Sequence, residues 1–149
     1  MSVKGRAHIA FKREIIQKPS KFYTQAPGFN IGHRWTLPSF QIREAAMLGS
    51  PDRRTCIEVF DHEAVIPAQG RKAESEDEVA YGALLHLALY VEDVEEMYQK
   101  ALVYGAKVCI HPEQLYLGEP PLVVKNALVY SPNGEVIEFI EEVDFNRSA

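Results

Sequence analysis

Two histidines and two glutamates recur at matching intervals in the two halves of the chain. His8 lies 50 residues before Glu58, and His86 lies 52 residues before Glu138. The offset between the halves is 78 residues for the histidines and 80 for the glutamates. Imidazole and carboxylate groups are common ligands of divalent first-row metals. The repeat therefore predicts one metal site made of these four side chains, provided that the two halves bring them together.

Both glutamates interrupt apolar stretches that are typical of buried strands. Glu58 lies within residues 55–60, and Glu138 lies within residues 136–140. An ionised carboxylate inside such a strand is costly unless it is paired or bound to a metal. Two imidazoles and two carboxylates form a neutral site with a dication, and this donor set suits Zn, Ni, Mn, Fe or Co. Four protein ligands on an octahedral ion would leave two positions for water or substrate oxygens, which a catalytic metal needs.

The alternative is that the same residues have ordinary structural roles and bind no metal. A single histidine in a strand is more often structural or solvated than a ligand, and a single glutamate can face water on the open side of a sheet. A metal-free binding cleft could also retain all four residues. Cys56 and Phe60 share the strand face of Glu58, and Tyr90 lies beyond His86, so all three are candidates for lining a cavity. Cys56 as a nucleophile is a further alternative, although no general base is placed beside it.

Three other histidines lie near expected strand ends or loops: His33, His62 and His111. We expect all three to be surface residues. His62 follows Glu58 by four residues on the same side and is the best spare candidate for a ligand.

The elements that must position these residues are clearest in the second half. Residues 84–91 alternate between a leucine stripe and a stripe that contains His86, which is the period of a strand. Asp93, followed by Glu96, predicts the start of a helix, and Gly105 predicts its end. We expect strands at residues 107–110, 123–130 and 135–142, a turn at residues 131–134, and a loop from about Leu115 to Val124. That loop and the linker between the halves would set specificity.

The first half repeats this plan more loosely. A strand begins at residues 8–11, and Pro19 suits the first turn of a short helix that ends at Pro27-Gly28. Further strands are expected at residues 30–37, 41–48 and 55–61. The fold class is therefore predicted as α+β, with two tandem βαβββ modules that form a cupped mixed sheet. The modules are expected at residues 1–70 and 83–149, joined by a charged linker at residues 71–82.

Composition narrows the range of functions. The chain has 149 residues, 46% of them hydrophobic and 25% charged, as in an ordinary globular domain. A net charge of −5 offers no basic face for nucleic acid. The sequence shows no secretory signal and no apolar run that could span a bilayer. Cys56 and Cys109 are too few for a disulfide framework, so we expect reduced thiols and a cytoplasmic protein.

Three stretches carry a resemblance to a known family: residues 8–11 with Phe22-Tyr23 and Gly28-Phe29 downstream, residues 86–94, and residues 131–138. On these motifs the chain resembles the vicinal oxygen chelate superfamily, which spans glyoxalases, bleomycin-resistance proteins and ring-cleaving dioxygenases. The resemblance covers nearly the whole chain except the linker and the tail after Glu142. The sequence departs from the family pattern at residues 12–14, where Lys-Arg-Glu replaces Val-x-Asp.

The resemblance implies paired modules with a divalent metal held by His8, Glu58, His86 and Glu138. It also implies a homodimer, in which the cup forms within one chain or across two. The ligand set looks most like that of the lactoylglutathione-lyase branch. The similar epimerase of methylmalonyl-CoA has glutamine at the place of Glu58.

The leading functional hypothesis is a metal-dependent, glyoxalase-like lyase or isomerase. It would act on a small α-hydroxycarbonyl-type substrate with two neighbouring oxygens by metal-stabilised enediolate formation. Glu138 or Glu58 would be the general base, and the resemblance favours Glu138. One alternative is a non-catalytic protein that binds a drug or metabolite, as bleomycin-resistance proteins do. The other is a ring-cleaving dioxygenase, which would need Fe or Mn and leave Glu58 unbound. The sequence shows no pattern that indicates recognition of glutathione.

Overall fold

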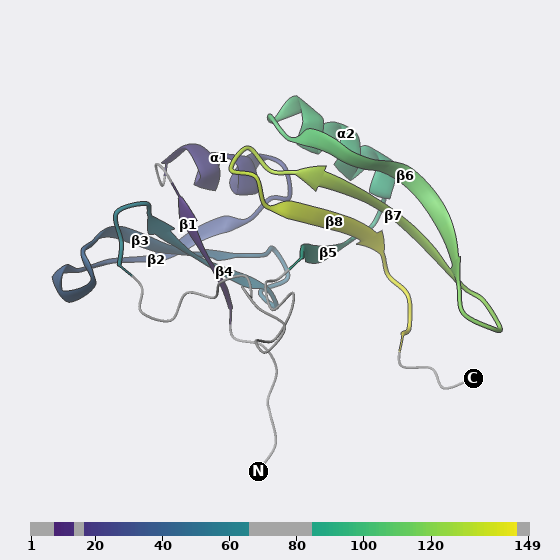
Figure 1. Cartoon of the computed structure of the whole chain (residues 1–149), viewed down its shortest axis with the longest axis horizontal. Coiled ribbons are helices and arrows are strands. Elements are labelled where there is room, and N and C mark those ends of the chain that lie inside the picture. The colour runs from purple at the N-terminus through teal and green to yellow at the C-terminus, as the bar shows by residue number, and fades with distance from the viewer. Residues whose placement is uncertain (1–7, 14–16, 66–84, 146–149) are drawn as a thin grey trace, which may run out of the picture. The chain divides into compact units, whose positions relative to one another are not determined.

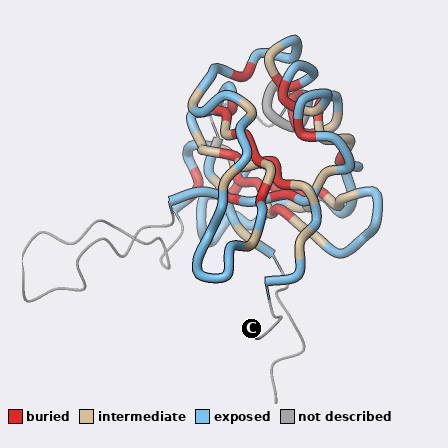
Figure 2. The backbone as a smooth tube through the Cα atoms, turned by 90° about the vertical axis from the view of Figure 1, so that its right-hand side faces the viewer, coloured by how far each residue is buried: buried red, intermediate tan, exposed pale blue. Residues whose placement is uncertain are grey.

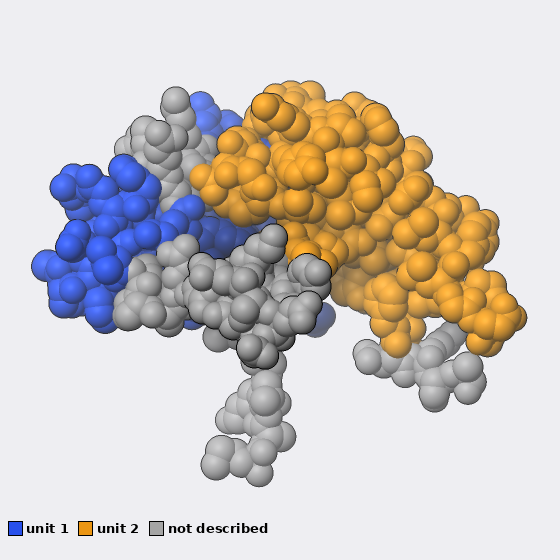
Figure 3. All heavy atoms as spheres, viewed as in Figure 1, with its two compact units in different colours: residues 1–83 blue, residues 84–149 orange. Residues whose placement is uncertain are grey.

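The computed structural model describes residues 8–13, 17–65 and 85–145. The chain divides into two compact units, residues 1–83 and 84–149, which are coloured separately in Figure 3. The predicted linker at residues 71–82 lies outside the described residues. Within each unit, one helix follows the first of four strands (Figure 1).

The first unit forms a four-stranded mixed sheet with the strand order β1-β4-β3-β2. Strand β1 pairs with β4 in parallel, and the other neighbours are antiparallel. The elements are β1 (Ile9–Arg13), α1 (Gln17–Gln25), β2 (Asn30–Leu37), a 3-10 turn (Pro38–Phe40), β3 (Ile42–Gly49) and β4 (Cys56–Asp61).

The second unit repeats this topology with the strand order β5-β8-β7-β6. Strand β5 pairs with β8 in parallel, as β1 does with β4. The elements are β5 (Leu87–Val91), α2 (Val94–Val103), β6 (Lys107–Leu117), β7 (Leu122–Tyr130) and β8 (Val136–Glu141). The two units confirm the predicted α+β class with two βαβββ modules.

Burial alternates along the strands that carry the candidate ligands (buried residues are red in Figure 2). Ile57 and Val59 of β4 are fully buried, and so are Ile137 and Phe139 of β8. These residues form the apolar face of each sheet, while the residues between them face the opposite side. The glutamates therefore belong to the second face by strand geometry alone.

Helix α2 begins and ends where the sequence predicts. The side chain of Asp93 accepts a hydrogen bond from the backbone N–H of Glu96 at 2.9 Å, which satisfies one of the free donors of the first turn. Gly105 has a φ of 101°, a conformation that favours glycine after a helix. The helix contacts β6, β7 and β8. No helix in the described part of the chain is long and apolar enough to cross a membrane.

Strand β6 is longer than predicted. It runs to Leu117, so the loop expected from about Leu115 to Val124 is reduced to a turn between β6 and β7. Pro112 lies where the pairing register shifts between Ile110 and Glu113. At such an irregularity a missing backbone N–H costs the sheet little.

The side chain of Asp61, at the end of β4, stabilises the following turn through hydrogen bonds. Its Oδ2 accepts hydrogen bonds from the backbone N–H groups of Arg43 at 2.9 Å and Glu44 at 3.0 Å. Its Oδ1 accepts one from Glu63 at 3.0 Å. Partial burial raises the pKa of Asp61, but the three donors outweigh it, and the pKa lies below its ordinary value.

Replacing Asp61 with asparagine is therefore expected to lower the free energy of unfolding by about 1–2 kcal/mol at neutral pH. The carboxylate stabilises the fold above the pKa of unfolded aspartate, about 3.9. That contribution is lost as the pH falls through the lowered pKa of the folded state. Urea unfolding at pH 7 and below pH 4 should show the difference between wild type and Asp61→Asn shrinking at acid pH. Glu92→Gln, at an exposed position, is the control, and a difference independent of pH would contradict the assignment.

Candidate metal centre

The first candidate pair lies at the junction of β1 and β4. In their parallel register, Ala10 is aligned with Glu58. His8 lies two residues before Ala10, so it shares the sheet face of Glu58. The Nε2 atom of His8 lies 2.8 Å from Oε2 of Glu58.

The second pair repeats this arrangement in the other unit. Ala88 of β5 is aligned with Glu138 of β8, and His86 lies two residues before Ala88. The Nε2 atom of His86 lies 3.2 Å from Oε2 of Glu138. The sequence predicted that each half carries an equivalent histidine and glutamate, and the register places them side by side within each unit.

Exposure is also matched between the pairs. The histidine side chains are 40% and 38% exposed, and the glutamate side chains are 17% and 15% exposed. Each carboxylate is thus largely withdrawn from water, while the imidazole beside it remains accessible. A partly buried carboxylate with one accessible nitrogen neighbour can attract a cation that enters from the open face.

The donor atoms have a spacing that suits a shared ion. Bonds of about 2.0–2.2 Å at right angles place adjacent ligand atoms about 3 Å apart. The two nitrogen–oxygen distances, 2.8 and 3.2 Å, are those of a direct hydrogen bond or ion pair, and they are also compatible with two ligands of one ion. Nitrogen and oxygen donors of this kind fit Zn, Ni, Mn, Fe or Co. Each pair can therefore provide two neighbouring ligands.

Two ligands are too few for a zinc site, which takes three or four protein ligands. In residues 8–13, 17–65 and 85–145, no group of three or more histidine, cysteine, aspartate or glutamate side chains could hold a metal ion. Each unit thus offers one pair.

The carboxylate of Glu138 has a second partner that sequence reasoning missed. Nδ2 of Asn126, on β7, donates a hydrogen bond to Oε1 of Glu138 at 2.8 Å. Asn126 is 5% exposed. The available signal was an amide inside the apolar run of residues 122–130, on the same strand parity as Leu128.

The predicted cavity-lining residues differ in their surroundings. Cys56 is half-buried at the start of β4. Phe60 is buried in an apolar cluster with Ile42, Ala45, Ala64 and Trp35. Tyr90 on β5 is 59% exposed, on the same strand parity as His86. Tyr90 is thus an accessible aromatic ring of the second unit, while Phe60 belongs to the apolar core of the first.

The three other histidines are exposed, as predicted. His33 stacks on Trp35 with a ring-centre distance of 5.7 Å. Nδ1 of His111 lies 2.9 Å from the hydroxyl of Tyr98. His62, the spare candidate, lies in the turn after β4.

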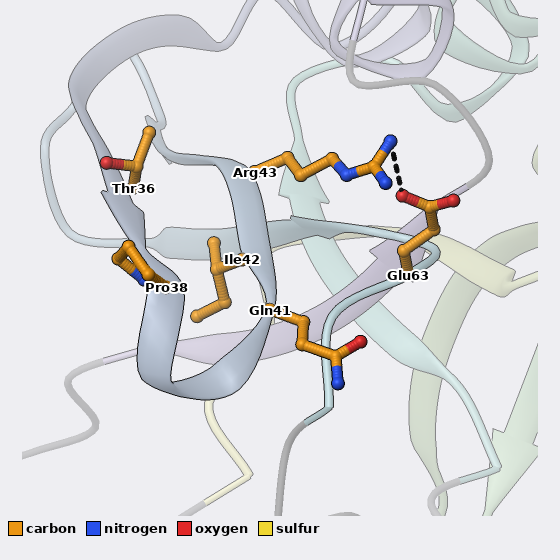
Figure 4. A pocket seen from close by; sticks show the side chains of 6 residues that line it. All are labelled: Thr36, Pro38, Gln41, Ile42, Arg43 and Glu63. Carbon is orange, nitrogen blue, oxygen red and sulfur yellow. Dashed lines mark ion pairs between the residues drawn. The ribbon is translucent and has the colours of Figure 1, made fainter.

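An open cavity of about 760 Å³ lies in the first unit, and sequence reasoning missed it. Figure 4 shows Arg43 reaching toward Glu63 at its rim, and their Nη1 and Oε2 atoms are 2.7 Å apart. The charges of Arg43 and Glu63 therefore compensate each other at the rim. The lining residues are Thr36, Pro38, Gln41, Ile42, Arg43 and Glu63, and none of them is a predicted ligand.

Comparison with solved structures identifies the fold. The chain is similar to glyoxalase I from Zea mays, with a TM-score of 0.65 and 17% identity over 92% of this chain and 44% of the maize protein. It is also similar to the fosfomycin resistance protein FosX from Listeria monocytogenes, with a TM-score of 0.62 and 12% identity over 96% of each chain. A glyoxalase family protein from Enterococcus faecalis matches with a TM-score of 0.63 and 20% identity over 93% of this chain and 98% of that one.

The chain therefore has the fold of the glyoxalase/bleomycin resistance/dioxygenase proteins, as the resemblance to the vicinal oxygen chelate superfamily implies. No family model and no curated protein matches its sequence. The chain spans less than half the length of the maize enzyme. The likeness is one of architecture, and the activity has to be argued from the site.

Proposed function

We propose that this protein is a metal-dependent, glyoxalase-like lyase or isomerase that acts on a small substrate with two neighbouring oxygens. The observation that carries the proposal is the equivalence of the two histidine–glutamate pairs in register, donor spacing and exposure. If each pair were only a surface ion pair, its recurrence at the equivalent position of the other unit would have no functional explanation. Joint binding of one ion by the two pairs would explain that recurrence. The FosX structure contains Mn(II), so at least one protein of this fold holds a divalent metal.

In this proposal His8, Glu58, His86 and Glu138 are the ligands of one divalent ion. When bound, the ion would act as a Lewis acid that stabilises negative charge developing on the substrate oxygens. The protein supplies the remaining parts. The histidines present Nε2 atoms, and Glu138 takes the proton from the carbon beside the carbonyl as the general base. The largely buried position of this carboxylate limits competition from water.

The equivalence of Glu58 and Glu138 argues against the ring-cleaving dioxygenase. That chemistry uses two histidines and one glutamate, so Glu58 would have no role as a ligand. Glu58 lies closer to His8, at 2.8 Å, than Glu138 lies to His86, at 3.2 Å, and the two carboxylates are similarly withdrawn from solvent. These contacts favour a set of four ligands. A non-catalytic binding protein remains as the competing outcome of the test below.

The test measures metal binding first and proton abstraction second. The full chain, freed of metal with a chelator, is titrated with Co²⁺, Ni²⁺, Zn²⁺ and Mn²⁺. We expect one ion for every four ligand residues. The loaded protein is then incubated in D₂O with α-hydroxycarbonyl compounds such as hydroxyacetone and dihydroxyacetone. Proton NMR should show loss of the signal of the C–H next to the carbonyl, and only in the presence of the ion.

The two readouts separate the competing functions. Exchange that depends on the ion supports an enzyme that forms an enediolate. Tight metal binding without exchange on any compound would point to other chemistry at the same ligands. Failure of every ion to bind would contradict the metal site and favour a protein that sequesters a drug or metabolite.

A further inference from the structure

The two carboxylates differ in one hydrogen bond. Asn126 lies two residues before Leu128 on β7, and Leu128 is the register partner of Glu138. Asn126 and Glu138 therefore share a sheet face. The amide Nδ2 donates to Oε1 of Glu138 at 2.8 Å, while Oε2 of the same carboxylate lies 3.2 Å from Nε2 of His86. Each oxygen of Glu138 has its own neighbour.

The first unit has no amide at the equivalent place. Met47 of β3 is the register partner of Glu58, and two residues before it lies Ala45. Ala45 faces Phe60 just as Asn126 faces Ile140. A methyl group donates no hydrogen bond. Among the described residues, Glu58 has His8 as its polar neighbour and has nothing that corresponds to Asn126.

Asn126 lowers the stability of the fold at its position. It is 5% exposed, and its Oδ1 atom is buried without a hydrogen-bond partner among the described residues. A buried carbonyl with no donor lowers the stability of a fold. The equivalent alanine in the first unit shows that this position of the module does not require a polar side chain. A purely structural role therefore does not explain the amide.

We propose that Asn126 is a positioning residue that holds Glu138 with Oε1 toward β7 and Oε2 toward His86. The carboxylate of the second unit is thereby held by two neighbours, while Glu58 has only its contact with His8 among the described residues. The two pairs are equivalent in residue type but differ in the hydrogen bonding of their carboxylates. The inference rests on the proposed metal site, because it concerns how one of its four ligands is oriented.

The experiment uses the full chain and two substitutions. Asn126→Leu keeps the branched shape of the side chain but removes the donor, and Asn126→Ala reproduces the side chain of the first unit. Each is titrated with Co²⁺ and followed by visible absorption, and each is melted without metal. Loss of a hydrogen-bond partner to a ligand typically costs about 10–100-fold in metal affinity. We expect a loss of that size in both, a changed cobalt spectrum, and a melting temperature for Asn126→Leu no lower than that of wild type.

Asn133→Ala is the matched control. Nδ2 of Asn133 also donates to a glutamate of the second unit, Glu135, but in the exposed turn before β8. It should leave the cobalt affinity unchanged. Unchanged affinity in both Asn126 variants, with wild type binding normally, would overturn the positioning role and leave the metal site intact. A wild type that binds no Co²⁺ would overturn the proposed function and this inference with it. If Asn126→Leu does not fold, Asn126→Ala decides.

Discussion

Replacing His86 with alanine is expected to abolish tight binding of Co²⁺ to the full chain. His86 would supply one of four ligands, and its Nε2 lies within ligand spacing of Glu138. Loss of a direct ligand should exceed the roughly 10–100-fold loss that follows removal of an outer partner. His8→Ala should have an equal effect, because His8 occupies the same register position in the first unit. Isothermal titration of each variant with Co²⁺ measures both affinity and stoichiometry.

The number of Co²⁺ ions bound per chain distinguishes a shared site from two separate sites. If the two pairs jointly bind one ion, either histidine substitution removes all tight binding. If each pair bound its own ion, each substitution would remove half of the sites and leave the others unchanged. That result would contradict a four-ligand centre. His111→Ala is the control, since His111 is an exposed histidine of the second unit whose side chain contacts Tyr98 and, within the part of the chain that the structure describes, no predicted ligand.

Glu138→Gln is expected to stop turnover while the fold is retained. General-base catalysis contributes about 10²–10⁴-fold to a rate, and the amide cannot accept the proton. The side chain keeps its shape, and the core residues on either side, Ile137 and Phe139, are unaffected. The measurement is the rate of C–H exchange in D₂O on an α-hydroxycarbonyl compound, with circular dichroism as the check on folding.

Glu142→Gln provides the matched comparison for this experiment. Glu142 is an exposed glutamate just after β8, so its replacement changes the net charge by the same amount without touching the pair. Exchange in Glu138→Gln at the rate of wild type would remove Glu138 from the role of base. Loss of exchange in Glu58→Gln alone, with metal retained, would transfer that role to Glu58.

Much of the fold follows from local patterns in the sequence. The strand β2 was predicted at its observed bounds, and β3 and β4 to within one residue, because turn residues and alternating apolar residues mark them. Asp93 and Gly105 mark the ends of α2, because capping involves neighbours a few residues away. The extension of β6 past Pro112 was not predicted, since it depends on a register irregularity opposite β7.

The candidate site was likewise predictable from the sequence only in part. The sequence alone determined which residue types recur and which strand face they share, because a repeat and a period of two are visible along the chain. Only the tertiary structure decided that His8 contacts Glu58 and that Asn126 contacts Glu138. Those contacts depend on the pairing register of strands far apart in the sequence. Register is set by which apolar faces pack together and by the geometry of the turns between strands, so it emerges only when the strands are assembled into a sheet.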